Sequence, residues 1–222
     1  MNFFKVNVMK KCKICNALTH RIEDPKKPLY YHRCETCGFV ALDDRFVVDF
    51  QTEQKHYEKH NNGFESQGYV AMFEDFIAKA VVPYEDSIKR ALDFGCGRGP
   101  VLAELLSRRG MEVDKYDLYF YPEKVYKDKQ YDLIVSTEVF EHLQDPIKIL
   151  ELFFKHTATN GYIILMTKFP PDEDDVFINW WYRRDITHIA FFTPRSFEIM
   201  AEELGLKVLK FIDNNIVIFQ KC

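Results

Sequence analysis

The sequence lacks any long apolar run, and its positive and negative charges nearly balance. The longest uninterrupted apolar stretches, such as residues 163–166, fall far short of the ~20 residues that a membrane-spanning helix needs. The net charge of −4 argues against a whole protein built to coat nucleic acid. The first thirteen residues hold four lysines among few apolar residues, too interrupted for the apolar region of a signal peptide. We therefore expect a cytoplasmic protein that makes no membrane contact.

The chain length predicts one full domain with a smaller appendage. With 222 residues, 47% of them hydrophobic, the chain can bury a sizeable core, and a prior of about 150 residues per domain leaves a short remainder. Residues 1–45 hold nine Lys or Arg against five Asp or Glu, so this segment carries +4 and the remainder −8. We expect an amino-terminal module over residues 1–50, a linker and bridging helix over 51–82, and the main domain over 83–222.

Four of the six cysteines form two Cys-x-x-Cys pairs. The pairs are separated by 18 residues, within the spacing expected of a four-cysteine zinc site. Two residues between thiolates let one tight turn aim both sulfurs at one ion, and four thiolates complete a closed tetrahedron that holds structure without performing chemistry. Chance pairing or a redox motif is the less favoured reading. The predicted zinc ligands are Cys12, Cys15, Cys34 and Cys37.

The residues around these pairs suit a zinc ribbon. Asn16 and Gly38, which tolerate positive φ, follow the second cysteine of each pair. Residues 28–33 predict a strand entering the second pair, and residues 39–42 a strand leaving it. Apolar residues between 69 and 80 recur at helical spacing and predict a helix whose aromatics pack on the next domain.

A strand, a glycine-rich turn and a helix follow one another from residue 91 to residue 109. Glycines in Gly95-Cys96-Gly97-Arg98-Gly99 allow a sharp turn and close approach of a ligand, although this turn alone is a weak signal. A second strand over 112–116 ends in Asp117, about 20 residues after the turn, where a carboxylate can accept both ribose hydroxyls. The pattern predicts a nucleoside site. A Rossmann dehydrogenase would also need a second nucleotide-binding repeat, which the sequence lacks.

The rest of the chain continues the alternation of strands and helices. Strands are predicted over 131–136, 162–166, 207–212 and 216–220, and the last two flank Asn214-Asn215 as a hairpin. Asp145 followed by Pro146 predicts a capped helix start, and Thr193-Pro194 predicts another. The fold class is therefore α/β, with a sheet of about six or seven strands.

Together these motifs resemble the class I S-adenosylmethionine-dependent methyltransferases over roughly residues 68–222. The resemblance lies in residues 92–99, in Asp117, in Tyr131-Asp132-Leu133-Ile134 and in Glu138-Val139-Phe140-Glu141-His142-Leu143. It is closest to the small-molecule branch with a Glu-His-Leu ending to its fourth motif. The resemblance implies an enzyme, S-adenosylmethionine as cofactor, and a Rossmann-like, mostly parallel sheet with an antiparallel last strand.

The resemblance also implies which residues contact the cofactor. Gly95 to Gly97 would line its methionine part, Asp117 would bind ribose, and Thr137 and Glu138 would face the transfer site. The full implied set is Asp93, Gly95, Cys96, Gly97, Asp117, Thr137 and Glu138. Only 13 residues separate Asp117 from Tyr131, too few for the family's usual helix and strand, so adenine recognition stays open. Stacking on the base and packing in the shortened crossover are both open for Tyr119, Phe120 and Tyr121.

The polar segment from 167 to 193 follows a strand and predicts the acceptor loop, since loops at strand carboxyl ends build α/β active sites. Its Thr167-Lys168-Phe169 turn, its Asn179-Trp180-Trp181-Tyr182-Arg183-Arg184-Asp185 stretch and its Thr187-His188 pair resemble a loop of bacterial small methyltransferases that carry a zinc ribbon. The acidic run 172–175 predicts a solvated face. The predicted acceptor-loop residues are Lys168, Trp180, Tyr182, Arg183, Arg184 and His188. His188 is the first candidate base because imidazoles titrate near neutrality, followed by Glu138, Glu141 and His142, although a structural role is open for each.

Three functions compete at this point. The leading one is methylation of a small molecule, such as a sugar nucleotide or a secondary-metabolite intermediate, with the ribbon as a lid or pocket wall. RNA methylation would use the basic ribbon to grip phosphates, and the overall acidity disfavours it. A non-catalytic interaction protein is disfavoured by the intact glycine turn and Asp117. The acceptor atom and the oligomeric state stay open.

Overall fold

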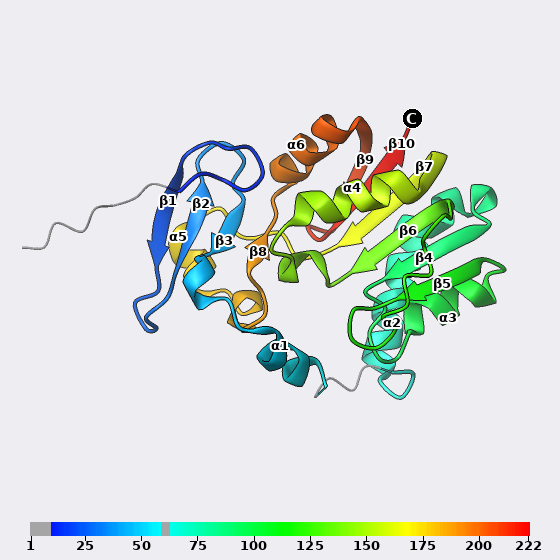
Figure 1. Cartoon of the computed structure of the whole chain (residues 1–222), viewed down its shortest axis with the longest axis horizontal. Coiled ribbons are helices and arrows are strands. Elements are labelled where there is room, and N and C mark those ends of the chain that lie inside the picture. The colour runs from blue at the N-terminus through cyan, green and yellow to red at the C-terminus, as the bar shows by residue number, and fades with distance from the viewer. Residues whose placement is uncertain (1–9, 59–62) are drawn as a thin grey trace, which may run out of the picture.

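The computed structural model describes residues 10–58 and 63–222, which form two β-sheets flanked by helices (Figure 1). The small sheet has the strand order β1-β2-β3-β8 and the large sheet the order β5-β4-β6-β7-β10-β9. Residues 1–9 of the predicted amino-terminal module and residues 59–62 of the predicted linker and bridging helix lie outside the described residues. Within those residues, no helix is long and apolar enough to cross a membrane.

The large sheet confirms the predicted α/β class. Strands β5, β4, β6 and β7 pair in parallel, whereas β10 pairs antiparallel with both β7 and β9. Strand β5 lies at the sheet edge, because the short segment after it supplies no further strand to this sheet. The strands are β4 (Arg90–Phe94), β5 (Glu112–Tyr116), β6 (Tyr131–Thr137), β7 (Thr157–Met166), β9 (Leu206–Ile212) and β10 (Ile216–Lys221).

Helices cover both faces of this sheet (Figure 1). Helices α4 and α6 pack with one buried cluster that includes Phe153 and Phe197, and α2 and α3 pack with a second that includes Phe76 and Leu106. The helices are α1 (Phe50–Tyr57), α2 (Gln67–Phe76), α3 (Val101–Arg108), α4 (Pro146–His156), α5 (Asp174–Asn179) and α6 (Pro194–Leu204). Helix α2 continues as a π-helix, η2 (Ile77–Val81), and a 3-10 helix, η3 (Val82–Ser87). Further 3-10 turns are η1 (Asp44–Phe46), η4 (Phe140–His142) and η5 (Tyr182–Arg184).

Two helix starts follow from local chemistry. The Asp145 carboxylate accepts the Lys148 N–H before α4, as its sequence predicts. Helix α6 begins with a reciprocal capping pair between Thr193 and Ser196, and it ends at Gly205 with φ +69°. These local interactions fix where α4 begins and where α6 begins and ends.

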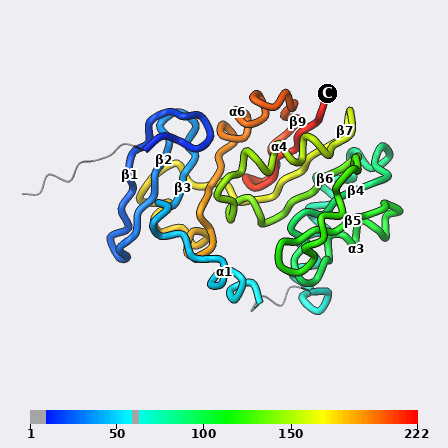
Figure 2. Tube along the Cα trace, viewed as in Figure 1, coloured from blue at the N-terminus to red at the C-terminus, as the bar shows by residue number. Residues whose placement is uncertain are grey.

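The small sheet joins distant parts of the sequence. Its strands β1 (Thr19–Glu23), β2 (Tyr30–Cys34) and β3 (Val40–Leu42) come from the amino-terminal module, but β8 (Ala190–Phe191) comes from the loop after β7. Figure 2 shows this later segment running beside the amino-terminal strands. Buried residues of the module and of α4 and α6 form one continuous cluster. The module therefore packs as part of the main domain, and the division at residues 50 and 82 stays a prediction.

Candidate cofactor and acceptor pocket

A cavity of about 1030 Å³ lies at the carboxyl ends of the parallel strands. Its wall is built by α1, α2, the glycine turn, the residues after β5 and β6, and the loop after β7. Small-molecule sites commonly measure ~300–1,000 Å³, so this one has room for a nucleoside cofactor together with a second small molecule.

The glycine turn brings the backbone close to the end of β6. Gly95 has φ +84° and Gly97 φ +66°, and a Cβ on Gly95 would lie 2.2 Å from Val139 Cγ2. Only glycine fits there without displacing Val139. The Cys96 thiol is buried, which raises its pKa. Asp93 lies buried at the end of β4, where burial raises its pKa to about 7 and one carboxylate oxygen has no hydrogen-bond partner among the described residues.

Three backbone donors fix the Asp117 carboxylate in the pocket wall. The Gly97 N–H donates to Oδ2 at 3.0 Å, and the N–H groups of Tyr119 and Phe120 donate to Oδ1 at 2.9 and 3.0 Å. Oδ1 uses both of its lone pairs for these N–H groups, whereas Oδ2 keeps one for a ligand hydroxyl. The predicted ribose ligand therefore has a geometry suited to that role.

Aromatic side chains cover this half of the pocket. Tyr119 and Phe120 line the cavity, and the Tyr119 ring centroid lies 5.2 Å from that of Phe50 and 5.3 Å from that of Tyr57 on α1. Tyr121 is not among the lining residues and forms a bridge with Asp117 outside the named strands. No sequence pattern had indicated that α1 contributes to the site.

The opposite half contains the partly buried carboxyl group of Glu138, the fully buried one of Glu141 and a tyrosine. The Tyr182 hydroxyl lies 3.0 Å from Glu138 Oε2 and also donates to Glu141 Oε1. A hydroxyl has one proton, so two such hydrogen bonds require a proton on one carboxyl group. Burial and the neighbouring Glu141 charge raise the pKa of Glu138 to about 8, and burial raises that of Glu141 to about 7. The pair therefore retains a proton near neutral pH.

Glu138 also has an unusual backbone. Its φ of +53° is in the left-handed region, which costs free energy for a residue with a side chain, and its N–H donates to the Met166 carbonyl at 2.8 Å. Such conformations concentrate at functional sites. The sequence offers no signal for this feature.

Two histidines line the cavity beside these carboxyl groups. His188 Nδ1 donates to the Tyr182 carbonyl at 2.7 Å, which assigns the unprotonated position to Nε2. Burial lowers the pKa of His188 to about 4, so the ring is neutral at pH 7. His142 Nδ1 lies 3.0 Å from the Thr187 carbonyl, and the two ring centroids are 4.7 Å apart. His188 can thus accept a hydrogen bond, but at neutral pH it holds no proton to donate from Nε2.

The predicted acceptor loop divides into two groups. Lys168, Tyr182 and Arg184 line the cavity, together with the unpredicted Trp181, whose side chain is 60% exposed. The other predicted residues, Trp180 and Arg183, lie outside the lining.

Trp180 and Arg183 have structural partners instead. Trp180 packs against Phe177, and its sequence neighbour Trp181 takes the place beside the cavity. The Arg183 guanidinium is buried and lies 2.7 Å from the Asp24 carboxylate of the ribbon. Because its charge is already paired, Arg183 is not available to bind an acceptor.

The acidic run and the ribbon also differ from the predictions. Asp174 is not simply solvated, since its carboxylate pairs with Arg33 at 2.8 Å and with His20 at 2.9 Å. None of the described residues 10–50 lines the cavity, so they form no pocket wall. The ribbon contacts the acceptor loop, and the loop contacts the pocket.

Thr137 lines the cavity as predicted, and so do Tyr69 and Phe73 of α2, for which we had expected packing only.

The four paired cysteines meet in one cluster. Cys12 Sγ lies 3.6 Å from Cys37 Sγ, and Cys15 Sγ lies 3.3 Å from Cys34 Sγ. Asn16 and Gly38 have φ of +57° and +71°, as the turn argument requires. Backbone N–H groups point at the sulfurs of Cys12 and Cys34, and the hydrogen bond shared with Cys37 lowers the pKa of Cys12 to about 5. The donor set fits a four-thiolate metal site.

The comparisons with known proteins agree with this geometry. Residues 65–210 match a family model described as a methyltransferase domain, so the chain belongs to this family and the predicted enzyme class is confirmed. We found no match among curated protein sequences.

Solved structures share the fold. An O-methyltransferase family protein from Burkholderia thailandensis has a TM-score of 0.54 at 12% identity, covering 80% of this chain and 61% of that one, so this chain spans less than two thirds of its length. DesVI from Streptomyces venezuelae has a TM-score of 0.55 at 14% identity, covering 79% and 99%. Magnesium protoporphyrin IX methyltransferase (ChlM) from Synechocystis PCC 6803, solved with bound SAM, has a TM-score of 0.51 at 12% identity, covering 80% and 94%.

Proposed function

We propose that this enzyme transfers a methyl group from S-adenosylmethionine to a hydroxyl group of a small molecule. The observation that carries the proposal is a single cavity with two different ends. One end has the glycine turn and Asp117, and the other has the hydrogen-bonded Glu138–Tyr182–Glu141 unit. The name of the ChlM neighbour specifies a small-molecule acceptor, magnesium protoporphyrin IX.

The cofactor end would orient the reaction. When bound, S-adenosylmethionine supplies a methyl group on a positively charged sulfur. Asp117 would accept a ribose hydroxyl through Oδ2, and the absence of a side chain at Gly95 and Gly97 lets the backbone approach the methionine part. Holding the reacting groups in line supplies effective molarities of ~10⁵ M or more.

The acceptor end would remove a proton. Glu138 lines the cavity, whereas Glu141 is fully buried behind it. Once Glu138 has lost its proton, its carboxylate, which faces the cavity, can accept the proton of an acceptor hydroxyl as the methyl group is transferred. A base with a pKa near neutrality is suited to this step, and burial brings that of Glu138 to about 8.

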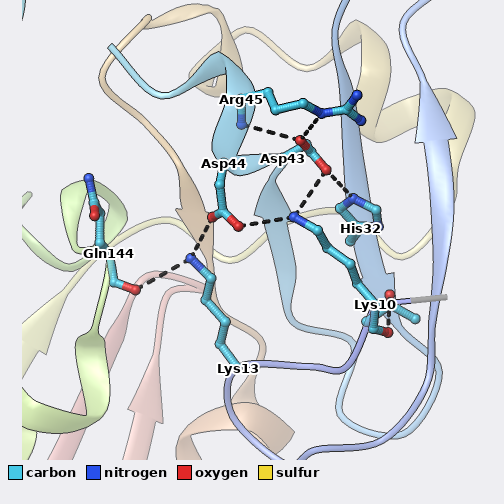
Figure 3. Close-up of polar contacts among 8 residues, drawn as sticks. Lys10, Lys13, His32, Asp43, Asp44, Arg45 and Gln144 are labelled. Carbon is cyan, nitrogen blue, oxygen red and sulfur yellow. Dashed lines mark hydrogen bonds and ion pairs between the residues drawn. The ribbon is translucent and has the colours of Figure 1, made fainter. Parts of the chain in front are cut away.

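The ribbon charges favour a small acceptor over RNA. Lys10 pairs with the carboxylates of Asp43 and Asp44, and Lys13 pairs with that of Asp44 (Figure 3). The N–O distances of these pairs are 3.0 to 3.1 Å. Arg45 also pairs with Asp43, at 2.9 Å. These cations have acidic partners within the ribbon, which weakens their attraction for phosphates. The net positive charge of residues 1–45 therefore does not form a basic face around Asp43 and Asp44.

We also propose that the four-cysteine cluster holds a structural zinc ion. The ion would supply folding free energy to a module with a small core, and Cys12, Cys15, Cys34 and Cys37 would hold it. Lys13 of this module donates to the Gln144 carbonyl at 3.5 Å, in the segment that borders the cavity.

Calorimetric titration of the zinc-analysed protein with S-adenosylmethionine and S-adenosylhomocysteine tests the cofactor first. We expect micromolar binding of both, and no binding would refute the proposal. Acceptors are then screened by transfer of a labelled methyl group.

The Glu138→Gln variant tests the proton step. General base catalysis is worth ~10²–10⁴ in rate, so kcat should fall by about that factor while cofactor affinity stays within about threefold. The Asp172→Asn variant, which changes an exposed carboxylate in the loop after β7, serves as the control and should keep the wild-type rate. A Glu138→Gln enzyme at full rate would remove Glu138 from the mechanism.

A further inference from the structure

Three potential metal ligands meet at the acceptor end of the pocket. Glu141, His142 and His188 each offer one ligand atom, and these atoms all lie within 4.8 Å of one another. The two histidines line the cavity, and Glu141 is fully buried behind them. This cluster is separate from the four cysteines of the ribbon.

The backbone orients both imidazoles as it does in metal sites. His188 Nδ1 is held by the Tyr182 carbonyl at 2.7 Å, and His142 Nδ1 lies 3.0 Å from the Thr187 carbonyl. Metal-binding histidines commonly donate one ring N–H to a carbonyl or carboxylate, which leaves the other nitrogen as the ligand. His142 Nε2 lies 4.0 Å from Glu141 Oε1, so the second nitrogen faces the carboxyl group.

The carboxyl group of Glu141 supplies an independent observation. Its side chain has no exposed surface, and its Oε2 has no hydrogen-bond partner among the described residues. A buried acceptor without a donor costs free energy. A cation bound by the carboxylate would remove this cost, and Tyr182 would still donate to Oε1.

We propose that Glu141, His142 and His188 bind a divalent cation of the first transition row, such as Zn²⁺, Fe²⁺ or Mn²⁺. Two imidazoles and one carboxylate suit these ions better than Mg²⁺ or Ca²⁺, which prefer oxygen ligands. Bonds of ~2.1 Å require each ligand atom to move inward by less than about 1 Å. Three protein ligands leave coordination positions open toward the cavity.

The role of this cation in methyl transfer rests on the proposed function. A hydroxyl oxygen bound to a cation loses its proton more readily, as bound water does. With Glu141 ionised on the cation, Tyr182 would donate to Glu141 Oε1 alone, and Glu138 would be ionised too. The acceptor hydroxyl would bind at the open position and pass its proton to the Glu138 carboxylate, and the oxygen would then attack the methyl carbon as its bond to sulfur breaks. The electron pair of that bond stays on sulfur. The acceptor would therefore be an alcohol or phenol.

Cobalt titration of the untagged, full-length chain tests the site without cofactor. Cobalt(II) in four thiolates absorbs strongly and at longer wavelength than cobalt(II) bound by imidazole and carboxylate, so the two sites have separate spectra. Elemental analysis counts the metal bound. We expect the thiolate spectrum first and then a second equivalent with the imidazole–carboxylate spectrum.

Two variants and a matched control locate the second equivalent. His188→Ala and Glu141→Gln should each weaken it by at least tenfold and leave the thiolate spectrum unchanged. His156→Ala removes another buried histidine whose Nδ1 meets a backbone carbonyl, that of Lys129 at 3.0 Å, but which does not line the cavity. This variant should keep both equivalents.

Binding of a single equivalent by the wild-type chain would overturn the proposal, and so would a second equivalent that persists in both variants at wild-type affinity. The wild-type titration decides even if a variant fails to fold. Because S-adenosylmethionine is absent, failure of this cation site would leave the proposed function standing. Conversely, failure of cofactor binding would leave the cation result standing.

Discussion

The buried ion pair between Arg183 and Asp24 predicts that the acceptor loop and the ribbon unfold together. The pair is 2.7 Å long, spans 159 residues of sequence, and its side chains are only 7% and 1% exposed. Arg183 also donates through Nε to the Ile178 carbonyl at 2.7 Å and through Nη1 to the Tyr31 hydroxyl at 3.3 Å. Replacing Arg183 would leave a buried carboxylate without its counter-charge.

We expect Arg183→Met to lower the free energy of unfolding by about 3–5 kcal/mol, the usual cost of removing one partner of a buried pair. Asp24→Asn should cost a similar amount, because the guanidinium then loses its charge partner. The double variant should cost clearly less than the sum, since neither charge is left alone. Urea denaturation, followed by tryptophan fluorescence and by release of zinc from the proposed four-cysteine site, measures all three. Arg184→Met, at an exposed neighbour in the sequence, is the control and should change stability by under about 0.5 kcal/mol.

The same pair predicts a pH dependence. Although burial acts to raise it, the Lys26 N–H and the Arg183 guanidinium hold the pKa of Asp24 below its ordinary value. A lowered folded-state pKa gives stability that is present above the ordinary value, ~3.9, and is lost as the pH falls below it. The difference in free energy of unfolding between the wild type and Arg183→Met should therefore become smaller as the pH falls. If Arg183→Met and Asp24→Asn each lower the free energy of unfolding by less than about 1 kcal/mol, and their effects add in the double variant, the assigned role of the ion pair is refuted.

Four further predictions concern the pocket and the cysteines. Asp117→Asn should weaken S-adenosylmethionine binding by about ten- to a hundredfold, the worth of hydrogen bonds to a charged group, and unchanged calorimetric affinity would exclude the ribose role. Gly95→Ala should abolish cofactor binding because its Cβ has no room, whereas Gly110→Ala, at a similar positive φ with nothing within 4 Å, should retain it. Cys34→Ser should lose zinc and lower the melting temperature, while the same change at the exposed carboxyl-terminal cysteine should do neither; full zinc content in the first variant would contradict the site. The transfer rate should rise with pH as a carboxyl group whose pKa burial raises to about 8 loses its proton, and this rise should vanish in Glu138→Gln.

Local signals made much of the main domain predictable. The strand expected over 112–116 is β5, and the caps at Asp145 and Thr193 begin α4 and α6 as their chemistry requires. The turn residues Asn16 and Gly38 have the positive φ that their positions imply. In each case the deciding interaction lies within a few residues of sequence, so a pattern can report it.

Long-range pairings were not predictable in this way. Strand β8 has two residues and exists because Val40 of β3 pairs with Phe191, which no periodicity in the loop indicates. The sequence alone suggests that Arg183 binds a ligand, because its carboxylate partner in the ribbon, Asp24, lies 159 residues away. Trp180 and Trp181 are adjacent and chemically identical, and only the turn of the backbone between them decides which one lines the cavity.

The contribution of the ribbon to the reaction follows from three consecutive residues of η5. Tyr182 reaches the two carboxyl groups, Arg183 reaches Asp24 of the ribbon, and Arg184 lines the cavity. A shift of Arg183 would move the Tyr182 hydroxyl, on which the shared proton depends. The amino-terminal module would have this effect even though none of the described residues 10–50 lines the cavity. We therefore expect the amino-terminal module to act on the site by holding this turn in place. Loss of the ribbon metal should lower kcat through Tyr182 more than it weakens cofactor binding, because the glycine turn and Asp117 belong to the large sheet.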